Sequence, residues 1–235
     1  MKSLSFFILP LLMSLGVQGA IPQSTEIDKV FVQWDKENSP GASLGIIKDG
    51  KLVYSRGYGM ANLEYGIPNS SKSVFRIGST SKQFTAASII LLAQQGKLNL
   101  NDTLDKYFPE FPDYANKITI THLLNHTSGV RDYLTLAYLA GMNNDDFYTD
   151  KEVLKWLINQ KNKNFEPGEK YLYSNSGYWL LSQIVEKAYG ENMAVFAQKE
   201  IFMPLKMNNT HFHNDHNQIV KNRASGYIPN DEDGY

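Results

Sequence analysis

The most constraining feature of this sequence is an almost uninterrupted apolar segment within residues 79–95. The segment has the pattern of a helix, and Gly96 follows it where helices commonly end in a left-handed residue. Apolar side chains occupy most of its circumference: Phe84, Ala86, Ala87, Ile89, Ile90, Leu91, Leu92 and Ala93. A helix that is apolar on most sides has to be buried. The sequence therefore predicts a central helix that other elements cover.

The segments around this helix predict one hairpin and several further helices. Residues 42–47 and 52–56 have the pattern of two strands joined at Asp49-Gly50, which is a strong hairpin signal. Helical patterns cover residues 24–38, 121–126, 149–160, 176–189 and 192–201. Thr149 and Glu152 form a capping box at the start of one of these helices. The predicted fold class is α+β, with an antiparallel sheet flanked by helices and a mainly helical region.

The hairpin lacks obvious strand partners in the rest of the chain, because little after Ser79 has the pattern of a strand. A two-stranded hairpin is only marginally stable by itself and needs more strands or a helix to pack on. We therefore expect the C-terminal strands of its sheet to be missing from these 235 residues and to come from beyond Tyr235.

The overall composition is that of an ordinary globular protein with one large domain or two small ones. Hydrophobic residues make up 42% and charged residues 20% of the chain. The 23 basic and 24 acidic residues nearly balance, and neither sign forms a long run, so we expect no nucleic-acid partner. The chain contains no cysteine, which excludes disulfide bonds.

The first 19 residues have the pattern of a secretory signal peptide. Lys2 provides a basic start, residues 4–17 form an apolar run, and small residues at Gly19 and Ala20 suit cleavage. A membrane anchor is the alternative, but the run is shorter than the ~20 residues that span a bilayer. We expect residues 1–19 to be removed on export to the periplasm or the medium. Residues 20–235 would remain as one domain without a stable membrane anchor.

The candidate nucleophile is Ser79, in the sequence Ser79-Thr80-Ser81-Lys82. On a helix this spacing places Ser79 and Lys82 on one face, one turn apart. A serine hydroxyl becomes a good nucleophile when a neighbouring base takes its proton, and a lysine amine held near a core can do so. The alternative is an N-cap serine followed by a surface lysine, because S-x-x-K arises about once by chance in a chain of this length. The apolar helix that follows Lys82 favours the catalytic interpretation.

The second candidate element is Tyr173-Ser174-Asn175, just before the helix predicted at residues 176–189. A tyrosine beside a lysine can act as general base or general acid. An asparagine two residues later can hydrogen-bond a substrate amide or the lysine. The alternative is that Tyr173 covers the edge of the core and Asn175 only caps a helix.

Together these segments resemble the serine β-lactamase-like hydrolases. The nucleophile segment from Phe75 to Thr85 is similar to that of the branch containing class C β-lactamases, D-alanyl-D-alanine carboxypeptidases and related esterases. Tyr173-Ser174-Asn175 is similar to the Y-x-N motif of this branch. Weaker similarities extend over most of the chain: Pro40-Gly41-Ala42, Leu123-Leu124-Asn125-His126-Thr127-Ser128-Gly129, and Pro204-Leu205 with Met207 and Thr210.

The resemblance implies a β-lactamase/transpeptidase-like α+β fold and hydrolysis of an amide, ester or β-lactam through an acyl-enzyme on Ser79. Lys82 and Tyr173 would relay the proton, Asn175 would orient a small-molecule or peptide-like substrate, and no cofactor is expected. The family's third motif, of the K-T-G or H-x-G type, supplies an oxyanion donor. Its one candidate in this chain, Ala224-Ser225-Gly226, lacks the basic residue. The alternative function is therefore a catalytically impaired homologue that binds peptide or peptidoglycan-like ligands.

A second, unrelated chemistry is suggested by the run from His211 to His216. His211, His213, Asp215 and His216 match H-x-H-x-D-H, a zinc-ligand pattern of metallo-β-lactamase-fold hydrolases. The preceding residues are polar rather than strand-like, and no histidine follows His216. We therefore expect no metal site here. His122 and His126 are four residues apart, and we expect one of them to pack and the other to cap rather than to bind metal.

Overall fold

The computed structural model describes residues 24–143, 146–215 and 217–229, which form two compact units. The first unit comprises residues up to Phe75 together with those from Lys221 onward, and the second comprises Arg76–Val220. The predicted signal peptide, residues 1–19, and the C-terminal Tyr235 lie outside the described residues. All four candidate catalytic and substrate-binding residues belong to the second unit.

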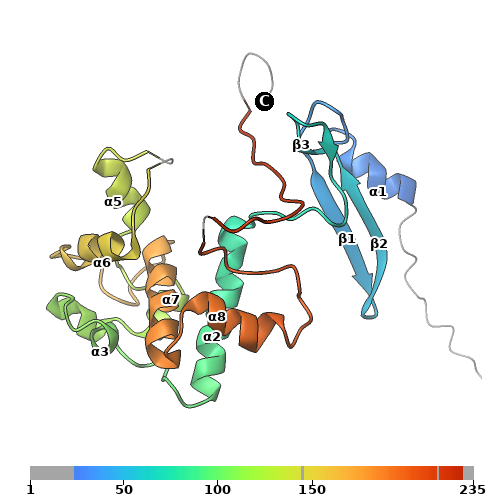
Figure 1. Cartoon of the computed structure of the whole chain (residues 1–235). Helices are drawn as coiled ribbons and strands as arrows, with labels where there is room; N and C mark the ends of the chain where they lie inside the picture. Colours follow the sequence, from blue (N-terminus) through green and yellow to red (C-terminus); the bar gives the residue numbers. More distant parts are fainter. Residues whose placement is uncertain (1–23, 144–145, 216, 230–235) are drawn as a thin grey trace, which may run out of the picture. The chain divides into compact units, whose positions relative to one another are not determined.

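The first unit is built on the predicted hairpin (Figure 1). Strands β1 (Ala42–Lys48) and β2 (Lys51–Tyr58) pair in antiparallel register from Ala42 opposite Tyr58 to Lys48 opposite Lys51. Asp49 and Gly50 have φ values of 51° and 72°, as the two central residues of a type I′ turn require. Two further strands, β3 (Met60–Asn62) and β4 (Ile67–Pro68), form a second small antiparallel pair.

Helix α1 (Ser24–Phe31) is shorter than the predicted helix at residues 24–38. The backbone N–H groups of Trp34 and Asp35 both donate to the Phe31 carbonyl, where the helix gives way to turns. The Asp35 side chain then accepts hydrogen bonds from Arg56 and from the Gly59 N–H. Its bonds to the β2 region favour the turn over continued helix.

The C-terminal part of the chain returns to the first unit. Arg223 forms a parallel bridge with Val74, and the Ser225 N–H donates to the Ala61 carbonyl over 2.8 Å. These contacts hold Ala224-Ser225-Gly226, the candidate for the third motif, next to β3. They join residues more than 100 positions apart in the sequence, and local sequence patterns do not predict such pairings.

The second unit is helical. A 3-10 turn, Gly78–Ser81, leads into α2 (Lys82–Gln94), which packs against α7 (Asn175–Tyr189). The remaining elements are α3 (Leu104–Tyr107), a 3-10 turn at Asp113–Lys117, α4 (Ile120–Leu124), α5 (Tyr133–Leu139), α6 (Asp150–Ile158), α8 (Met193–Ala197) and a π-helical turn at Gln198–Phe202. Helices α3 and α5 were not predicted. Both are shorter than the window over which helical periodicity can be recognised.

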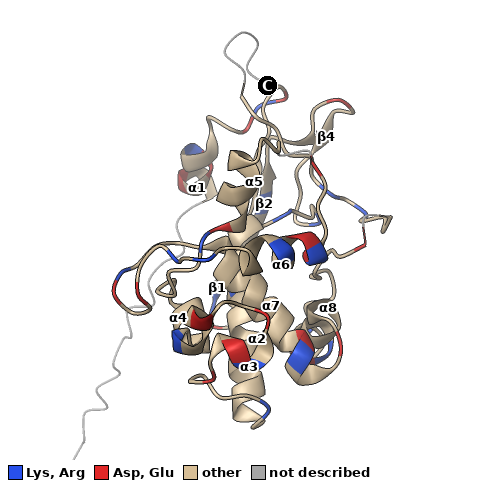
Figure 2. Ribbon diagram, turned by 90° about the vertical axis from the view of Figure 1, so that its left-hand side faces the viewer, with Lys and Arg blue, Asp and Glu red and all other residues tan. Residues whose placement is uncertain are grey.

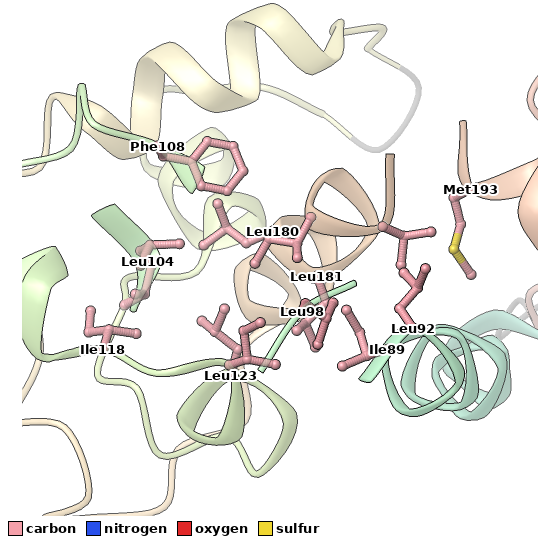
Figure 3. Packing of buried hydrophobic residues seen from close by; sticks show 14 of the residues in the cluster. Ile89, Leu92, Leu98, Leu104, Phe108, Ile118, Leu123, Leu180, Leu181 and Met193 are labelled. Carbon is pink, nitrogen blue, oxygen red and sulfur yellow. The ribbon is translucent and has the colours of Figure 1, made fainter. Parts of the chain in front are cut away.

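The core of the second unit lies between α2 and α7. Ile89 and Leu92 of α2 and Leu180 and Leu181 of α7 are completely buried, and Figure 3 shows them packed against residues of α3 and α4. The expectation of a fully covered α2 is only partly met, because Ile90 remains 40% exposed. In the described part of the second unit, α2 is therefore buried along one face.

Charged side chains of both signs are interspersed along the described chain (Figure 2). Helix α6 shows the pattern, since it begins Asp150-Lys151-Glu152 and carries Lys155 in its last turn. None of the helices in residues 24–143, 146–215 and 217–229 is long and apolar enough to cross a membrane.

Candidate active site

Ser79 lies on the 3-10 turn that precedes α2. Gly78 has a φ of 52°, a conformation that costs glycine less than other residues, and it directs the chain into this turn. Lys82 is the first residue of α2, so the turn and the helix together bring the two side chains to the same side. The Lys82 Nζ donates a hydrogen bond to Ser79 Oγ over 3.0 Å. The predicted pairing of Ser79 and Lys82 is therefore present.

The loop before α7 brings Tyr173 and Asn175 to the same place. The Tyr173 hydroxyl donates to Ser79 Oγ over 2.7 Å, and Lys82 Nζ donates to Asn175 Oδ1 over 3.0 Å. Lys82 Nζ also lies 4.8 Å from the centre of the Tyr173 ring. The structure thus joins all four sequence-predicted residues in one hydrogen-bonded cluster, although Ser79 and Tyr173 are 94 residues apart.

The Tyr173 hydroxyl has an unusual electrostatic environment for a side chain that is still 42% exposed. Partial burial and the nearby Asp132 raise its pKa, whereas hydrogen bonds with Lys82 and Ser79 and the charge of Lys82 lower it. The lowering effects prevail, so the pKa lies below the usual value of 10.0. A phenol of this kind gives up its proton more readily than an ordinary tyrosine, as a general base must.

Asp132 positions the start of α7, and we did not identify it from the sequence. Its Oδ1 accepts from the N–H groups of Leu134 and Thr135 and so caps α5. Its Oδ2 accepts from the backbone N–H of Asn175, the first residue of α7. One carboxylate therefore links the starts of two helices. An aspartate just before an apolar segment is an N-cap signal, but its link to Asn175 is not local.

Ser176 reinforces the same junction. Its Oγ donates to the Arg131 carbonyl over 2.7 Å and accepts from the Tyr133 N–H over 2.8 Å. Ser174 is the N-cap of α7, and its Oγ accepts from the Gly177 N–H. The Tyr173-Ser174-Asn175 segment is thus held by neighbours on both sides, which limits how far Tyr173 and Asn175 can move.

The two histidines of the preceding loop have the predicted division of roles. His122 caps α4, because its Nδ1 accepts from the Thr119 N–H in a capping box. His126 packs, with its ring 4.5 Å from that of Tyr173. The expectation that one histidine caps and the other packs is confirmed.

A cavity of about 430 Å³ adjoins the cluster, within the size range of small-molecule sites. Lys82 and Asn175 form part of its wall, and aromatic and apolar side chains form more of it: Tyr133, Trp179, Met193 and Phe212. Ser79 and Tyr173 do not line this cavity, so it meets the cluster on the side of Lys82 and Asn175.

Among the candidate zinc residues, His213 lines the same cavity as Lys82 and Asn175. The rings of His211 and His213 are 5.8 Å apart in an edge-to-face arrangement. Within the part of the chain that the structure describes, no three His, Cys, Asp or Glu side chains are grouped as metal ligands. His216 lies outside that part.

Comparison with known proteins identifies relatives over most of the chain. The Beta-lactamase family model matches residues 27–234. Penicillin-binding protein 4* of Bacillus subtilis (strain 168) is 37% identical over 182 residues, which cover 76% of this chain and 40% of that protein. The chain therefore spans less than half the length of this relative.

Solved structures agree with the sequence match. An octameric penicillin-binding protein homologue from Pyrococcus abyssi superposes with a TM-score of 0.78 at 32% identity, over 91% of this chain and 49% of that one. A D-amino acid amidase from Ochrobactrum anthropi SV3 gives 0.70 at 28% identity, over 79% and 52%. The predicted α+β fold class and the resemblance read from the motifs are both confirmed. The chain belongs to the beta-lactamase family, whose members are serine hydrolases.

Proposed function

We propose that this chain carries the acylation site of a serine hydrolase, with Ser79 as the nucleophile. The observation that supports this most directly is the convergence of two hydrogen bonds on Ser79 Oγ, one from Lys82 Nζ at 3.0 Å and one from the Tyr173 hydroxyl at 2.7 Å. A serine oxygen held between an ammonium group and a phenol has both a base to take its proton and a charge to stabilise that base.

In the proposed first step, the Tyr173 phenolate accepts the proton of Ser79 while Ser79 Oγ attacks the substrate carbonyl carbon. The Lys82 ammonium group stabilises the phenolate, consistent with the lowered pKa of Tyr173. The backbone N–H of Ser79 donates to the oxyanion that forms. When the carbonyl group re-forms, the bond to the leaving group breaks, and the Tyr173 hydroxyl returns its proton to that group.

In the second step, water attacks the ester formed on Ser79. Tyr173, again a phenolate after protonating the leaving group, takes a proton from the water and then passes it back to Ser79 Oγ. The products are a free carboxylic acid and the original enzyme. Asn175 keeps Lys82 in place through its Oδ1, and its amide nitrogen can donate to a substrate carbonyl.

We propose an amide, an ester or a β-lactam as the substrate class. Two relatives, a penicillin-binding protein and a D-amino acid amidase, are named for compounds with an acyl group bound to nitrogen. We also propose that the protein is exported, which rests on the signal-peptide pattern at residues 1–19.

Covalent labelling tests the proposal. The chain should react with a fluorophosphonate or a β-lactam reagent, and Ser79→Ala should abolish the reaction. Ser81→Ala is a matched control, since it removes a hydroxyl from the same 3-10 turn and should leave labelling intact. Equal labelling of the parent chain and Ser79→Ala would overturn the proposal. Tight ligand binding without labelling would favour the alternative, a non-catalytic binding homologue.

A further inference from the structure

The backbone around His126 is hydrogen-bonded to the segment that leads to Tyr173. Three backbone hydrogen bonds pair it with the chain that leads to Tyr173. The His126 carbonyl accepts from Leu172 N–H at 2.9 Å, the Thr127 carbonyl from Gly168 N–H at 2.8 Å and the Gly129 carbonyl from Asn164 N–H at 2.8 Å. His126 itself adopts a φ of 57°, a left-handed conformation that is uncommon outside glycine.

The His126 side chain adds a fourth hydrogen bond, at the end of this pairing that lies next to Tyr173. Its Nδ1 accepts from the Ser174 N–H over 3.1 Å. With the carbonyl bond to Leu172, His126 therefore fixes the residues immediately before and after Tyr173. The imidazole ring also packs on the Tyr173 ring in a tilted arrangement, with centroids 4.5 Å apart and planes 30° apart.

This arrangement requires one protonation state of the ring. A nitrogen that accepts a hydrogen bond cannot carry a proton, so His126 must be neutral, with its proton on Nε2. The environment favours that state, because burial and the positive charge of Lys82 both lower the pKa of His126 below its usual value of 6.5.

We propose that His126 is a positioning residue whose neutral ring holds Tyr173 against Ser79, and that protonation of His126 releases Tyr173 and switches the site off at acidic pH. The proposal rests on the proposed function of Ser79 and Tyr173. A protonated Nδ1 would become a donor facing the Ser174 N–H, also a donor. The bond would be lost, and a buried N–H would be left without an acceptor.

Among the groups around the ring, the charge of Lys82 lowers the pKa of His126 and the Ser174 backbone raises it, and the lowering effects prevail. Lys82 is the cation that acts on it, and the rings of Tyr171, Tyr173 and Tyr178 surround it at 5.9, 4.5 and 5.1 Å. A second positive charge beside Lys82 is unfavourable. The neutral form is therefore stabilised by folding, and this stabilisation is lost as the pH falls through a pKa below 6.5.

Two substitutions separate the proposed role from simple packing. His126→Asn keeps an acceptor, because Asn Oδ1 can take the place of Nδ1, tolerates left-handed φ and does not titrate in this range. His126→Leu fills the site with an apolar side chain, which offers no hydrogen-bond acceptor. The readout is the rate of fluorophosphonate labelling of the 235-residue chain as a function of pH.

The labelling rate of the parent chain falls as Tyr173 becomes protonated, and we expect a second, additional decline with a midpoint below pH 6.5. His126→Asn should label at a comparable rate at neutral pH and lack this second acid decline. His126→Leu should be slower by on the order of 10², the cost of misplacing a catalytic group by about an ångström. His122→Asn is the matched control, since it alters a histidine that caps α4, and it should keep the acid decline.

Nuclear magnetic resonance of ¹⁵N-histidine-labelled chain provides a readout that does not depend on turnover. At neutral pH, His126 should show an unprotonated Nδ1 and a protonated Nε2, and the Ser174 amide signal should move with the same midpoint as the ring. A protonated Nδ1 at neutral pH, or a second acid decline below pH 6.5 that persists in His126→Asn, would overturn the proposal. If the parent chain does not label at all, the proposed function fails, and the tautomer and the Ser174 signal still decide whether His126 holds the Tyr173 segment.

Discussion

At the scale of single residues, the acid–base character of the site rests on the Tyr173 hydroxyl. Its surroundings lower the pKa of this hydroxyl below the usual 10.0, which is the direction that a general base needs. Lys82 contacts the other three site residues: its Nζ donates to Ser79 and Asn175 and lies over the Tyr173 ring. In the proposed mechanism, Tyr173 therefore accepts the proton of Ser79, and Lys82 supplies the charge that stabilises the phenolate.

Tyr173→Phe should keep the ring that packs on His126 and remove only the hydroxyl. We expect acylation to slow by on the order of 10²–10⁴, the usual contribution of a positioned acid or base. Labelling of the parent chain should rise with pH through a pKa below 10, because the phenolate is the active form, and the variant should lack this rise.

Tyr178→Phe is the control for this experiment. Tyr178 also lies near Lys82, at 5.6 Å from the ring centre, but its hydroxyl donates to the Leu124 carbonyl instead of Ser79. Its labelling rate and pH dependence should match those of the parent chain. A Tyr173→Phe variant with the same rate and pH dependence as the parent would exclude Tyr173 as the base.

At the scale of elements, the site depends on how the starts of α5 and α7 are joined. Asp132 caps α5 and binds the first backbone N–H of α7, so the position of Asn175 depends on a helix 43 residues earlier in the chain. The core contacts between α2 and α7 then set the distance between Ser79 and Tyr173. A displacement at either junction would therefore change the distances between the four site residues.

Asp132→Ala should lower the free energy of unfolding by about 2 kcal/mol, because it removes a helix cap and an acceptor for a second backbone N–H. Labelling should slow as well, since Asn175 loses its anchor. Thr149→Ala removes only the cap of α6, so it should cost about 1 kcal/mol and leave the labelling rate unchanged. Denaturant unfolding and labelling kinetics measure both effects. Equal labelling rates in the two variants would show that Asp132 has a stabilising role alone.

Elements with local signals could be predicted from the sequence, and those without could not. The Asp49-Gly50 turn and the Thr149 capping box depend on neighbouring residues, and both are present as predicted. Ser79, Lys82, Tyr173 and Asn175 were found through two short motifs. Asp132 was missed because its hydrogen bond to Asn175 crosses 43 residues.

At the scale of the whole molecule, the chain divides into two units, and the cluster of the four site residues lies within one of them. Residues 76–220 contain all four site residues, the adjoining cavity and the described part of the candidate zinc run. The return of Arg223 and Ser225 to the first unit was not predicted, because it pairs distant backbone segments without a side-chain pattern.

The serine mechanism predicts that metal is not needed. Dialysis against a chelator, or His211→Ala together with His213→Ala, should leave fluorophosphonate labelling unchanged. Elemental analysis of the purified chain should find zinc well below one ion per molecule. Stoichiometric zinc together with chelator-sensitive hydrolysis would support the His211–His216 run in place of Ser79.

If Ser79 is the nucleophile, a covalent reagent forms its adduct there, and the position of the adduct can be determined in the unmodified sequence. The 235-residue chain is treated with a β-lactam or fluorophosphonate, digested, and analysed by tandem mass spectrometry. We expect one adduct per chain, on Ser79. An adduct on another residue, such as Ser81 or Ser176, would contradict it.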